Sequence, residues 1–472
     1  MKRSTLGLIL LLSFCFAVIS LPKINMVKAN MTIYIKVDGS IDPSTAPISS
    51  VENITYSFTG LINSSIVVER DNIVIDGTGN VVQGTGTRMG IDLTGRINVT
   101  IKRVEIEAFL YGIELYNSSN NRICESSIKN NEYGIHLAGS SSNIISENNI
   151  TNNRLCGVML SASSDNILWG NKINNNVWGV LLRASSSYNI LFGNKITNNE
   201  EGVELDDSPD NIISGNSMEN NWAGIGLVRW TDNNSISGNN LTNNKNGVWL
   251  NYGYMFNNKF YHNNFINNTK QRAGLSSFFT GNFWDDGYPF GGNYWSDYIG
   301  TDEKSGPNQN QPGSDGIGDS YYEIDKDIID YYPFMGMYSS FNTPSDYKVD
   351  IVSNSSVSEF DFSLINSSHA RLYFNVIGEI GTKGFCRICI PKALVNDSYT
   401  VRFNGEVITY PQVRELPCSN GKYEYLYINY THSEHRIEIS GTITEFPSLS
   451  IITLFMMAAQ LAVIVYRRKL SV

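Results

Sequence analysis

The sequence predicts an all-β protein whose main part is a parallel β-helix, and three observations support this. The first is a repeat: one phrase recurs every 22 or 23 residues, with copies that begin at Asn143, Asn166, Asn189, Asn211 and Asn234. A period of this length is typical of stacked units, none of which can bury its apolar face alone.

The second observation is the pattern inside each repeat. Apolar residues alternate with polar ones in short runs, such as Gly202 to Leu205 and Gly247 to Leu250. This is strand spacing, with one side chain inward and the next outward, and no 3.6-residue rhythm lasts long enough for a helix. Three short strands per repeat fit a β-helix, whereas a leucine-rich horseshoe needs a leucine spacing and a helical half that are absent.

The third observation is the asparagine at the corners. This residue tolerates left-handed backbone, and its amide can hydrogen-bond along the stack. The predicted corner ladder consists of Asn131, Asn153, Asn176, Asn199, Asn221 and Asn244.

The N-terminal part precedes the regular repeats. Residues 1–29 have the pattern of a secretory signal peptide, because Lys2 and Arg3 come before an apolar run; a retained N-terminal anchor is the alternative. Residues 30–71 are expected to be a lead-in that covers the first turn, since a β-helix exposes strand edges at both ends. Residues 72–280 then form about nine turns, a rod about 40 Å long at a strand spacing of about 4.8 Å.

The segment 281–340 breaks the period and is crowded with aromatic and acidic residues. Aromatic side chains cover apolar surface well, so this segment is predicted to cap the rod. It also contains Asp302, Asp315 and Asp319, with Gly316 and Gly318 between the last two. Aspartate oxygens on glycine-rich loops suit a hard cation, so a structural calcium site is expected here, although the spacing is not that of an EF-hand.

The C-terminal part predicts a second domain and a membrane anchor. Residues 345–443 contain alternating strands separated by turns, which indicates a small β-sandwich. Residues 446–466 are uncharged and long enough to span a bilayer, and the basic tail 467–472 belongs on the cytoplasmic side. The chain is therefore expected at the cell surface, anchored in the cytoplasmic membrane. Asn-x-Ser/Thr triplets that fit a glycosylated exterior begin at Asn98, Asn117, Asn149, Asn240, Asn354 and Asn429.

Composition excludes some functions. Charged residues are 17 % of the chain and the net charge is -10, which argues against a nucleic-acid partner. Six cysteines include one in the signal segment, so the remaining five cannot all pair with each other. Cys386 and Cys389 have metal-like spacing, but no second pair completes a zinc site, and two residues of a buried strand are favoured.

Outward positions of the repeats are the candidate binding surface. In the strand after each repeated glycine, the second and fourth residues are expected to point outward. This exposed ladder is Glu114, Tyr116, His136, Met159, Leu181, Arg183, Glu204, Asp206, Val228, Trp249 and Asn251. Aromatic faces stack on sugar rings, and carboxylate and guanidinium groups bond hydroxyls. The candidate carbohydrate-binding residues are Arg183, Glu204, Asp206, Arg229, Trp230, Trp249 and Tyr252, and a merely solvated face is the alternative.

Catalysis on this surface is a second hypothesis. A glycoside hydrolase needs two carboxyl groups about 5 to 9.5 Å apart. Glu204, Asp206 and Asp207 are the candidates, and Arg183 or Arg229 would serve a polysaccharide lyase as base. Acidic residues beside a turn are common, however, and no catalytic histidine flanks them. A non-catalytic surface protein that binds or presents polysaccharide is therefore the leading prediction.

Several segments resemble a known family. The Asn-x-Ile repeats are similar to the right-handed β-helix of NosD-type, carbohydrate-binding and sugar-hydrolase (CASH) proteins. Archaeal surface members of that group are similar in the segments 38–47, 68–77, 291–297, 313–319 and 446–448. The resemblance implies the fold and an external location, but this fold hosts lyases, hydrolases, adhesins and metallochaperone-like proteins.

A copper-related accessory role is the third hypothesis that this family suggests. Copper is bound by grouped His, Met or Cys side chains. The rod offers His136, His262, Met159, Met218, Cys124 and Cys156, which the repeat register is expected to spread over different faces.

Overall fold

The computed structural model describes residues 32–251, 253–274, 281–326, 328–344, 347–366, 368–396 and 398–443. All regular elements in these ranges are β-strands. No helix long and apolar enough to cross a membrane occurs in them. The predicted signal peptide 1–29, transmembrane helix 446–466 and tail 467–472 lie outside the described residues.

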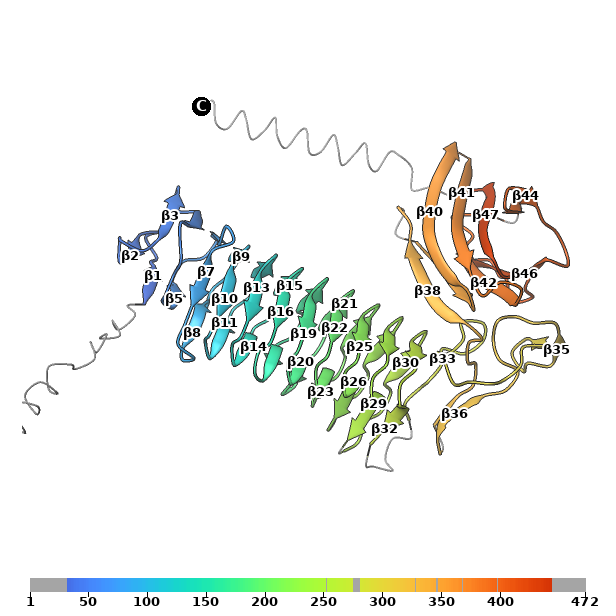
Figure 1. Cartoon of the computed structure of the whole chain (residues 1–472), viewed down its shortest axis with the longest axis horizontal. Helices are drawn as coiled ribbons and strands as arrows, with labels where there is room; N and C mark the ends of the chain where they lie inside the picture. The colour runs from blue at the N-terminus through green and yellow to red at the C-terminus, as the bar shows by residue number, and fades with distance from the viewer. Residues whose placement is uncertain are drawn as a thin grey trace, which may run out of the picture.

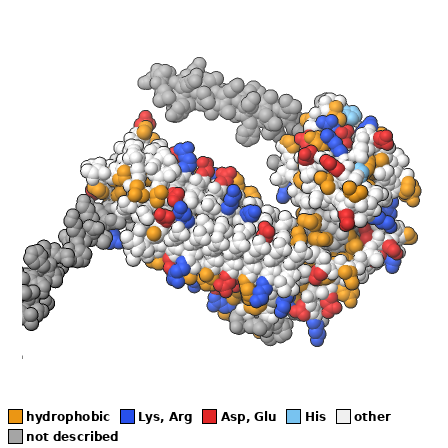
Figure 2. All heavy atoms as spheres, in the orientation of Figure 1, with side chains coloured by type: hydrophobic (Ala, Val, Ile, Leu, Met, Phe, Trp, Pro, Cys, Tyr) orange, Lys and Arg blue, Asp and Glu red, His pale blue; other side chains and the backbone are white. Residues whose placement is uncertain are grey.

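A rod of stacked turns forms most of the molecule (Figure 1). Each of nine consecutive turns, from β6 (Val74–Asp76) to β32 (Lys270–Ala273), adds one strand to each of three parallel sheets. The predicted parallel β-helix of about nine turns is confirmed. Acidic and basic side chains are interspersed along the visible surface of the rod (Figure 2).

The three sheets run along the rod in turn order. The twelve-stranded sheet consists of β2 (Ile41–Asp42), β1 (Ile33–Ile35), β5 (Ile66–Val68), β8 (Met89–Asp92), β11 (Tyr111–Tyr116), β14 (Tyr133–Ala138), β17 (Cys156–Ser161), β20 (Trp178–Arg183), β23 (Glu201–Asp206), β26 (Ala223–Val228), β29 (Asn246–Asn251) and β32. The eleven-stranded sheet consists of β3 (Ile48–Val51), β4 (Thr55–Phe58), β6, β9 (Thr100–Lys102), β12 (Arg122–Cys124), β15 (Ile144–Ser146), β18 (Ile167–Trp169), β21 (Ile190–Phe192), β24 (Ile212–Ser214), β27 (Ser235–Ser237) and β30 (Lys259–Tyr261). The ten-stranded sheet consists of β33 (Tyr294–Trp295), β31 (Asn264–Ile266), β28 (Asn240–Thr242), β25 (Ser217–Glu219), β22 (Lys195–Thr197), β19 (Lys172–Asn174), β16 (Asn149–Thr151), β13 (Ser127–Lys129), β10 (Glu105–Glu107) and β7 (Val81–Gln83). Strands β1, β4 and β5 of the predicted lead-in thus already extend the rod.

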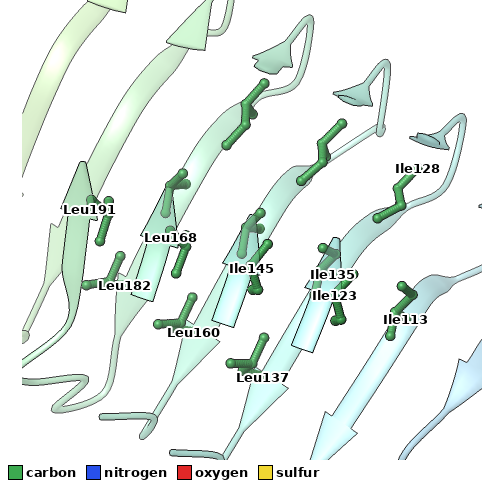
Figure 3. Close-up of a cluster of buried hydrophobic side chains, with 14 of the residues drawn as sticks. Ile113, Ile123, Ile128, Ile135, Leu137, Ile145, Leu160, Leu168, Leu182 and Leu191 are labelled. Carbon is green, nitrogen blue, oxygen red and sulfur yellow. The ribbon is translucent and has the colours of Figure 1, made fainter. Parts of the chain in front are cut away.

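Columns of branched aliphatic side chains fill the interior of the rod. Ile113, Ile135 and their successors Val158 and Val180 occupy successive positions of the twelve-stranded sheet, and all are fully buried. Figure 3 labels Ile113 and Ile135 of this column. The regular stacking of β-branched and leucine side chains lets each turn pack against the next in one continuous apolar core. The inward positions of the repeat are therefore those that the sequence predicts.

Stacked asparagines close the corners between the sheets. The backbone N–H and the Nδ2 group of Asn166 both donate to Oδ1 of Asn189, at 2.9 and 3.0 Å. Such bonds, from the backbone N–H of one asparagine to Oδ1 of the asparagine one turn later, form three ladders along the rod, whereas the sequence predicts one. The predicted ladder runs Asn131, Asn153, Asn176, Asn199, Asn221, Asn244 and Asn268; the others run Asn121, Asn143, Asn166, Asn189, Asn211, Asn234, Asn258 and Asn282, and Asn148, Asn171, Asn194, Asn216, Asn239, Asn263 and Asn293.

The left-handed backbone at these corners lies one residue earlier than expected. Asn152, Asn175 and Asn198 have positive φ, whereas the ladder asparagines that follow them do not. The positive-φ residue turns the chain, and the next residue then points its amide into the stack. Asparagine therefore serves two separate roles at adjacent positions.

Aromatic side chains cover the last turn of the rod. Trp284 stacks on Phe260 with ring centroids 4.2 Å apart, and Trp295 stacks on Phe265 at 4.1 Å. The buried carboxylate of Asp330 accepts a hydrogen bond from Trp295 Nε1 at 2.8 Å, and burial raises its pKa to about 7. Two short hairpins belong to this segment: β34 (Lys304–Ser305) with β35 (Gln311–Pro312), and β36 (Tyr322–Asp325) with β37 (Ile328–Asp330).

Two five-stranded antiparallel sheets follow and share one apolar core. One sheet consists of β38 (Met337–Asn342), β39 (Lys348–Ser353), β42 (Lys383–Pro391), β46 (Tyr423–Thr431) and β45 (Val413–Glu415). The other consists of β40 (Ser356–Asn366), β41 (His369–Ile377), β47 (Glu434–Thr442), β43 (Tyr399–Phe403) and β44 (Glu406–Val407). Asn264 of the rod donates to the carbonyl of Tyr338 at 2.8 Å, which joins this part to the rod. That the segment 345–443 is a separate β-sandwich domain stays a prediction.

We expect Asn166→Ala to lower the free energy of unfolding by about 3 kcal/mol. The substitution leaves the buried N–H of Asn143 and the buried carbonyl group of Ser140 without partners, and each such loss costs about 1 to 3 kcal/mol. The measurement is urea unfolding of the full chain. Asn149→Ala, at an exposed strand position, is the control and is expected to change stability by less than about 0.5 kcal/mol. Equal effects of the two changes would contradict the ladder argument.

Candidate functional site

Three columns of side chains point outward from the twelve-stranded sheet, and together they are called the outer face here. The first column is the residue before each repeated glycine, and the second and third are the second and fourth residues after it. They are Tyr111, Tyr133, Cys156, Trp178, Glu201, Ala223 and Asn246; Glu114, His136, Met159, Leu181, Glu204, Gly226 and Trp249; and Tyr116, Ala138, Ser161, Arg183, Asp206, Val228 and Asn251. The predicted alternation along these strands is confirmed.

The prediction that the whole second column is exposed is wrong at three positions. Glu114, Met159 and Leu181 point outward but are only 5 %, 7 % and 6 % exposed. The bulky first column covers Met159 and Leu181, because they form a satellite apolar cluster with Cys156, Tyr133 and Trp178. Glu114 is bonded to His136 of the next turn. An outward direction therefore does not guarantee exposure when the neighbouring column carries large side chains.

One end of the outer face is aromatic. The rings of Tyr111 and Tyr133 stack at 5.0 Å, and the His136 ring stacks on Tyr111 at the same distance. His136 Nδ1 lies 2.9 Å from Glu114 Oε2, so the histidine is tied to the carboxylate below it.

A pair of carboxyl groups lies at the centre of the outer face. Glu201 and Glu204 hydrogen-bond each other, and Trp178 Nε1 donates to Glu204 Oε2 at 3.1 Å. The pKa of Glu201 is raised to about 9; burial is the largest cause, and the adjacent Glu204 is the next. No donor from the described residues reaches the buried Oε2 of Glu201, so a proton on this carboxyl group is what lets it bond to Glu204.

The next turn makes room for this pair. Gly226 follows Glu204 in its column, and a Cβ atom at Gly226 would lie 2.7 Å from Glu201 Oε2. Because no side chain is present at Gly226, the Glu201 carboxyl group can occupy that space.

Two tryptophans lie next to Ala223 and Gly226, the small residues that β26 contributes to the first and second columns. The rings of Trp222 and Trp249 meet edge to face at 4.9 Å, and Lys245 Nζ lies 5.9 Å from the centre of the Trp222 ring. Both tryptophans are half-buried, which leaves part of each ring accessible.

The other predicted binding residues lie on or beside the third column. Asp206 pairs with Arg229, whose Nε donates to Oδ1 at 2.7 Å, and Arg183 precedes Asp206 in the column. Trp230, at the corner after β26, is 61 % exposed. Asp207 is a turn residue with positive φ. The structure thus brings Arg183, Glu204, Asp206, Arg229, Trp230 and Trp249 to one region, whereas Tyr252 lies outside the described residues.

Three residues of this region are not among those predicted from the sequence: Glu201, Trp178 and Trp222. Glu201 and Trp178 each precede a repeated glycine, so comparing this position between repeats would have found them. Trp222 lies at a corner and belongs to no strand. No periodic signal marks it.

The predicted calcium ligands are all hydrogen-bonded within the chain. The Asp302 carboxylate accepts from the N–H groups of Asp315 and Gly316, both at 2.8 Å, and burial raises its pKa to about 7. Asp319 accepts from the N–H groups of Glu303 and Lys304. Within the described ranges, no group of three or more His, Cys, Asp or Glu side chains is arranged to hold a metal ion. Calcium binding by Asp302, Asp315 and Asp319 stays a prediction.

The carboxyl pair predicts a pH-dependent stability. A glutamate in the unfolded chain releases its proton at about pH 4.3, whereas Glu201 keeps it to about pH 9, so the folded state binds the extra proton in between. Stability therefore falls as pH rises through this window. Glu201→Gln keeps a neutral side chain, and we expect the loss of melting temperature from pH 5 to pH 8 to be smaller in this variant.

Glu147→Gln, at an exposed position of another turn, is the control for this experiment and is expected to behave as the unmodified chain. Identical pH profiles for Glu201→Gln and the unmodified protein would contradict the raised pKa of Glu201.

The calcium hypothesis predicts that a chelator lowers the melting temperature of the protein and that added calcium restores it. A bound ion stabilises the folded state by mass action. The double variant Asp315→Asn with Asp319→Asn is expected to melt at one temperature in both conditions. Equal melting temperatures of the unmodified protein with and without chelator would refute the hypothesis.

The fold places the protein in the parallel β-helix class. A family model described as "Periplasmic copper-binding protein (NosD)" matches residues 32–228 and 156–300, more than half of the chain. The chain belongs to this NosD family. A search of curated proteins finds no match.

Several solved structures are weakly similar. The Dettilon tailspike protein is 15 % identical over 82 % of this chain and 86 % of its own, with a TM-score of 0.34. A variant of the periplasmic alginate epimerase AlgG is 17 % identical over 53 % of this chain and 83 % of its own, with a TM-score of 0.39. An alginate lyase from Paenibacillus sp. is 15 % identical over 50 % and 89 %, with a TM-score of 0.36. Similarities at this level carry no information on the substrate or activity of this chain.

The family description raises the question whether the candidate copper ligands fit the metal. Contrary to the expected spread, His136 and Met159 are direct neighbours in one column, and Cys156 lies beside them. However, Cys156 is fully buried and donates to the carbonyl of Val158, and burial raises its pKa, which opposes the thiolate that binds metals. The bond from His136 Nδ1 to Glu114 leaves Nε2 as the metal-binding atom of that ring, so His136 and the buried Met159 are the two donors that remain in this cluster.

The remaining donors are scattered. Met218 is buried inside the rod, Cys124 lies on the eleven-stranded sheet, and the His262 ring stacks on Tyr338 at 4.4 Å. The described side chains therefore do not fit a copper site.

Proposed function

We propose that this NosD-family protein binds or presents carbohydrate through the outer face of its twelve-stranded sheet. The observation that supports this best is a set of partly accessible aromatic rings beside hydrogen-bonding groups, along one side of a rigid rod. Trp178, Trp222 and Trp249 lie around the carboxyl pair, and the pair Asp206–Arg229 lies next to it. Ring faces suit the apolar faces of sugars, and the polar groups suit their hydroxyls.

The dimensions favour a long chain as ligand. Aromatic residues occur on the outer face from β11 to β29, six strand steps of about 4.8 Å, or about 29 Å. A polysaccharide that lies along the rod would contact several turns at once, so weak contacts would add. The rod is rigid because every turn is hydrogen-bonded to the next, which lowers the entropy cost of binding.

Binding is favoured over catalysis on the same surface. The two carboxyl groups of a glycoside hydrolase lie about 5 to 9.5 Å apart, whereas Glu201 and Glu204 are in direct contact. Asp206, the other candidate, is held by Arg229. Arg183 and Arg229 are the remaining candidates for the base of a lyase, and Arg229 is occupied in the same ion pair.

The proposed location is the outside of the cytoplasmic membrane, with the C-terminal segment as anchor. The supporting observations are the apolar residues 446–466, the basic tail after them and the secretory pattern in residues 1–29. The partner in this proposal is a surface or environmental polysaccharide.

Trp249→Ala tests the proposed function. We expect the full-length chain to bind at least one member of a polysaccharide panel, and this change to weaken that binding at least tenfold, because it removes an accessible ring next to Trp222. The measurement is a glycan array followed by titration calorimetry with the polysaccharide that binds.

Trp169→Ala is the matched control. Trp169 is also a half-buried aromatic residue, stacked on Phe192 at 6.0 Å, but it belongs to the eleven-stranded sheet. Its loss is expected to leave binding unchanged. An array with no binding above background, or equal effects of the two variants, would leave a structural stalk as the better hypothesis.

A further inference from the structure

A large cleft lies outside the outer face. It lies at the junction between the segment 281–336, called the capping segment here because its aromatic side chains cover the last turn, and the two C-terminal sheets formed by β38 to β47. Its volume is 1060 Å³, and it separates the loop Thr301–Glu303 from the outward side of β42, β45 and β46. Ligand sites in proteins are commonly clefts of about 300 to 1000 Å³ at such junctions. No part of the proposed function uses this cleft.

The cleft is preformed because two arginines hold its walls. Arg387 donates to the carbonyl groups of Asp315 and Pro289, both at 2.6 Å, and thereby ties the capping segment to β42. Arg414 of β45 donates to the carbonyl of Ser314, and its guanidinium group lies 5.2 Å from the centre of the Tyr427 ring. A ligand therefore does not have to order these walls on binding.

The floor and rim of the cleft combine aromatic and amide groups. Phe385 and Tyr427 stack in the floor, with ring centroids 5.6 Å apart and an angle of 11° between the rings. Tyr410, which also lines the cleft, is 78 % exposed. The lining residue Asn429 of β46 is exposed as well, and its Nδ2 group donates to the carbonyl of Pro411 at 3.4 Å. An exposed aromatic ring beside an exposed amide suits a ligand with one apolar face and many hydroxyl groups.

The charges in the cleft decide between ligand classes. Asp302 and Glu303 line the loop side, and Lys383 and Arg414 line the sheet side. A polyanion would meet Glu303, and a polycation would meet Lys383, at a cost of several kcal/mol for each like-charge contact that is desolvated. Hydroxyl groups both donate and accept, so an uncharged sugar satisfies both walls.

We propose that the junction cleft is a second binding site, specific for a short neutral oligosaccharide. Tyr410 stacks on a sugar ring, and Asn429 bonds its hydroxyls. This site is separate from the outer face and does not depend on the proposed function of that face.

The test is titration calorimetry of the full chain with neutral glucan oligomers, galacturonate oligomers and chitosan oligomers. The protein is produced in a host without N-glycosylation, because the triplet Asn429 to Thr431 is a glycosylation signal inside the cleft. We expect a neutral oligomer to bind and the two charged oligomers to bind at least tenfold more weakly. Tyr410→Ala and Asn429→Ala are each expected to weaken binding of the neutral oligomer at least tenfold.

Tyr331→Ala is the matched control, since Tyr331 is 59 % exposed but lies outside the cleft, and it is expected to leave binding unchanged. No neutral oligomer binding, binding insensitive to both cleft variants, or a preference for a charged oligomer would overturn the proposal. Binding that is lost in Trp249→Ala but kept in Tyr410→Ala would place the sugar on the outer face. That result would overturn the cleft proposal and leave the proposed function standing.

Discussion

The hydrogen bonds between stacked asparagines are the constraint on which the rest of the rod depends. Most ladder asparagines receive two hydrogen bonds on one amide oxygen, from the backbone N–H and the Nδ2 group of the asparagine one turn before, as Asn189 does from Asn166 and Asn211 does from Asn189. A turn that slipped by one residue would lose these bonds and reverse its inward and outward side chains. The ladders therefore keep every turn in register, and that register creates the columns of the core and of the outer face.

Most of the rod could be predicted because it repeats. The number of turns, the strand spacing and the inward columns all follow from a period that is visible many times in one sequence. Neighbouring positions that have the same residue type but different roles were harder to distinguish. Asn152 and Asn153 are the same residue type, but the first takes the positive φ and the second enters the ladder. A single sequence contains no signal that distinguishes them, because asparagine is suitable for both.

The candidate site was predicted only in part, because its chemistry depends on contacts between columns. Glu204, Asp206 and Trp249 follow from the alternation within a strand. The raised pKa of Glu201 does not, since it requires Glu204 three residues later and an empty space at Gly226 one turn above. In the sequence, Gly226 leaves one position of the second column without a side chain. In the fold, the Glu201 carboxyl group fills the space that such a side chain would take. Burial of Met159 and Leu181 likewise depends on Trp178 and Tyr133 in the adjoining column.

The features that a regular rod lacks occur where the chain departs from the repeat. The ladder step from Asn263 to Asn293 spans 30 residues instead of 22 to 24, and the inserted loop contributes Trp284 to the aromatic cover of the last turn. The junction cleft forms beyond this point, beside the hydrogen bond between Arg414 and Ser314, which are 100 residues apart in sequence. Periodicity predicts neither the contact nor the open space beside it, because each arises once. The charged walls and the aromatic floor of that cleft therefore had to be found in the folded chain, whereas the outer face could be anticipated from the repeat.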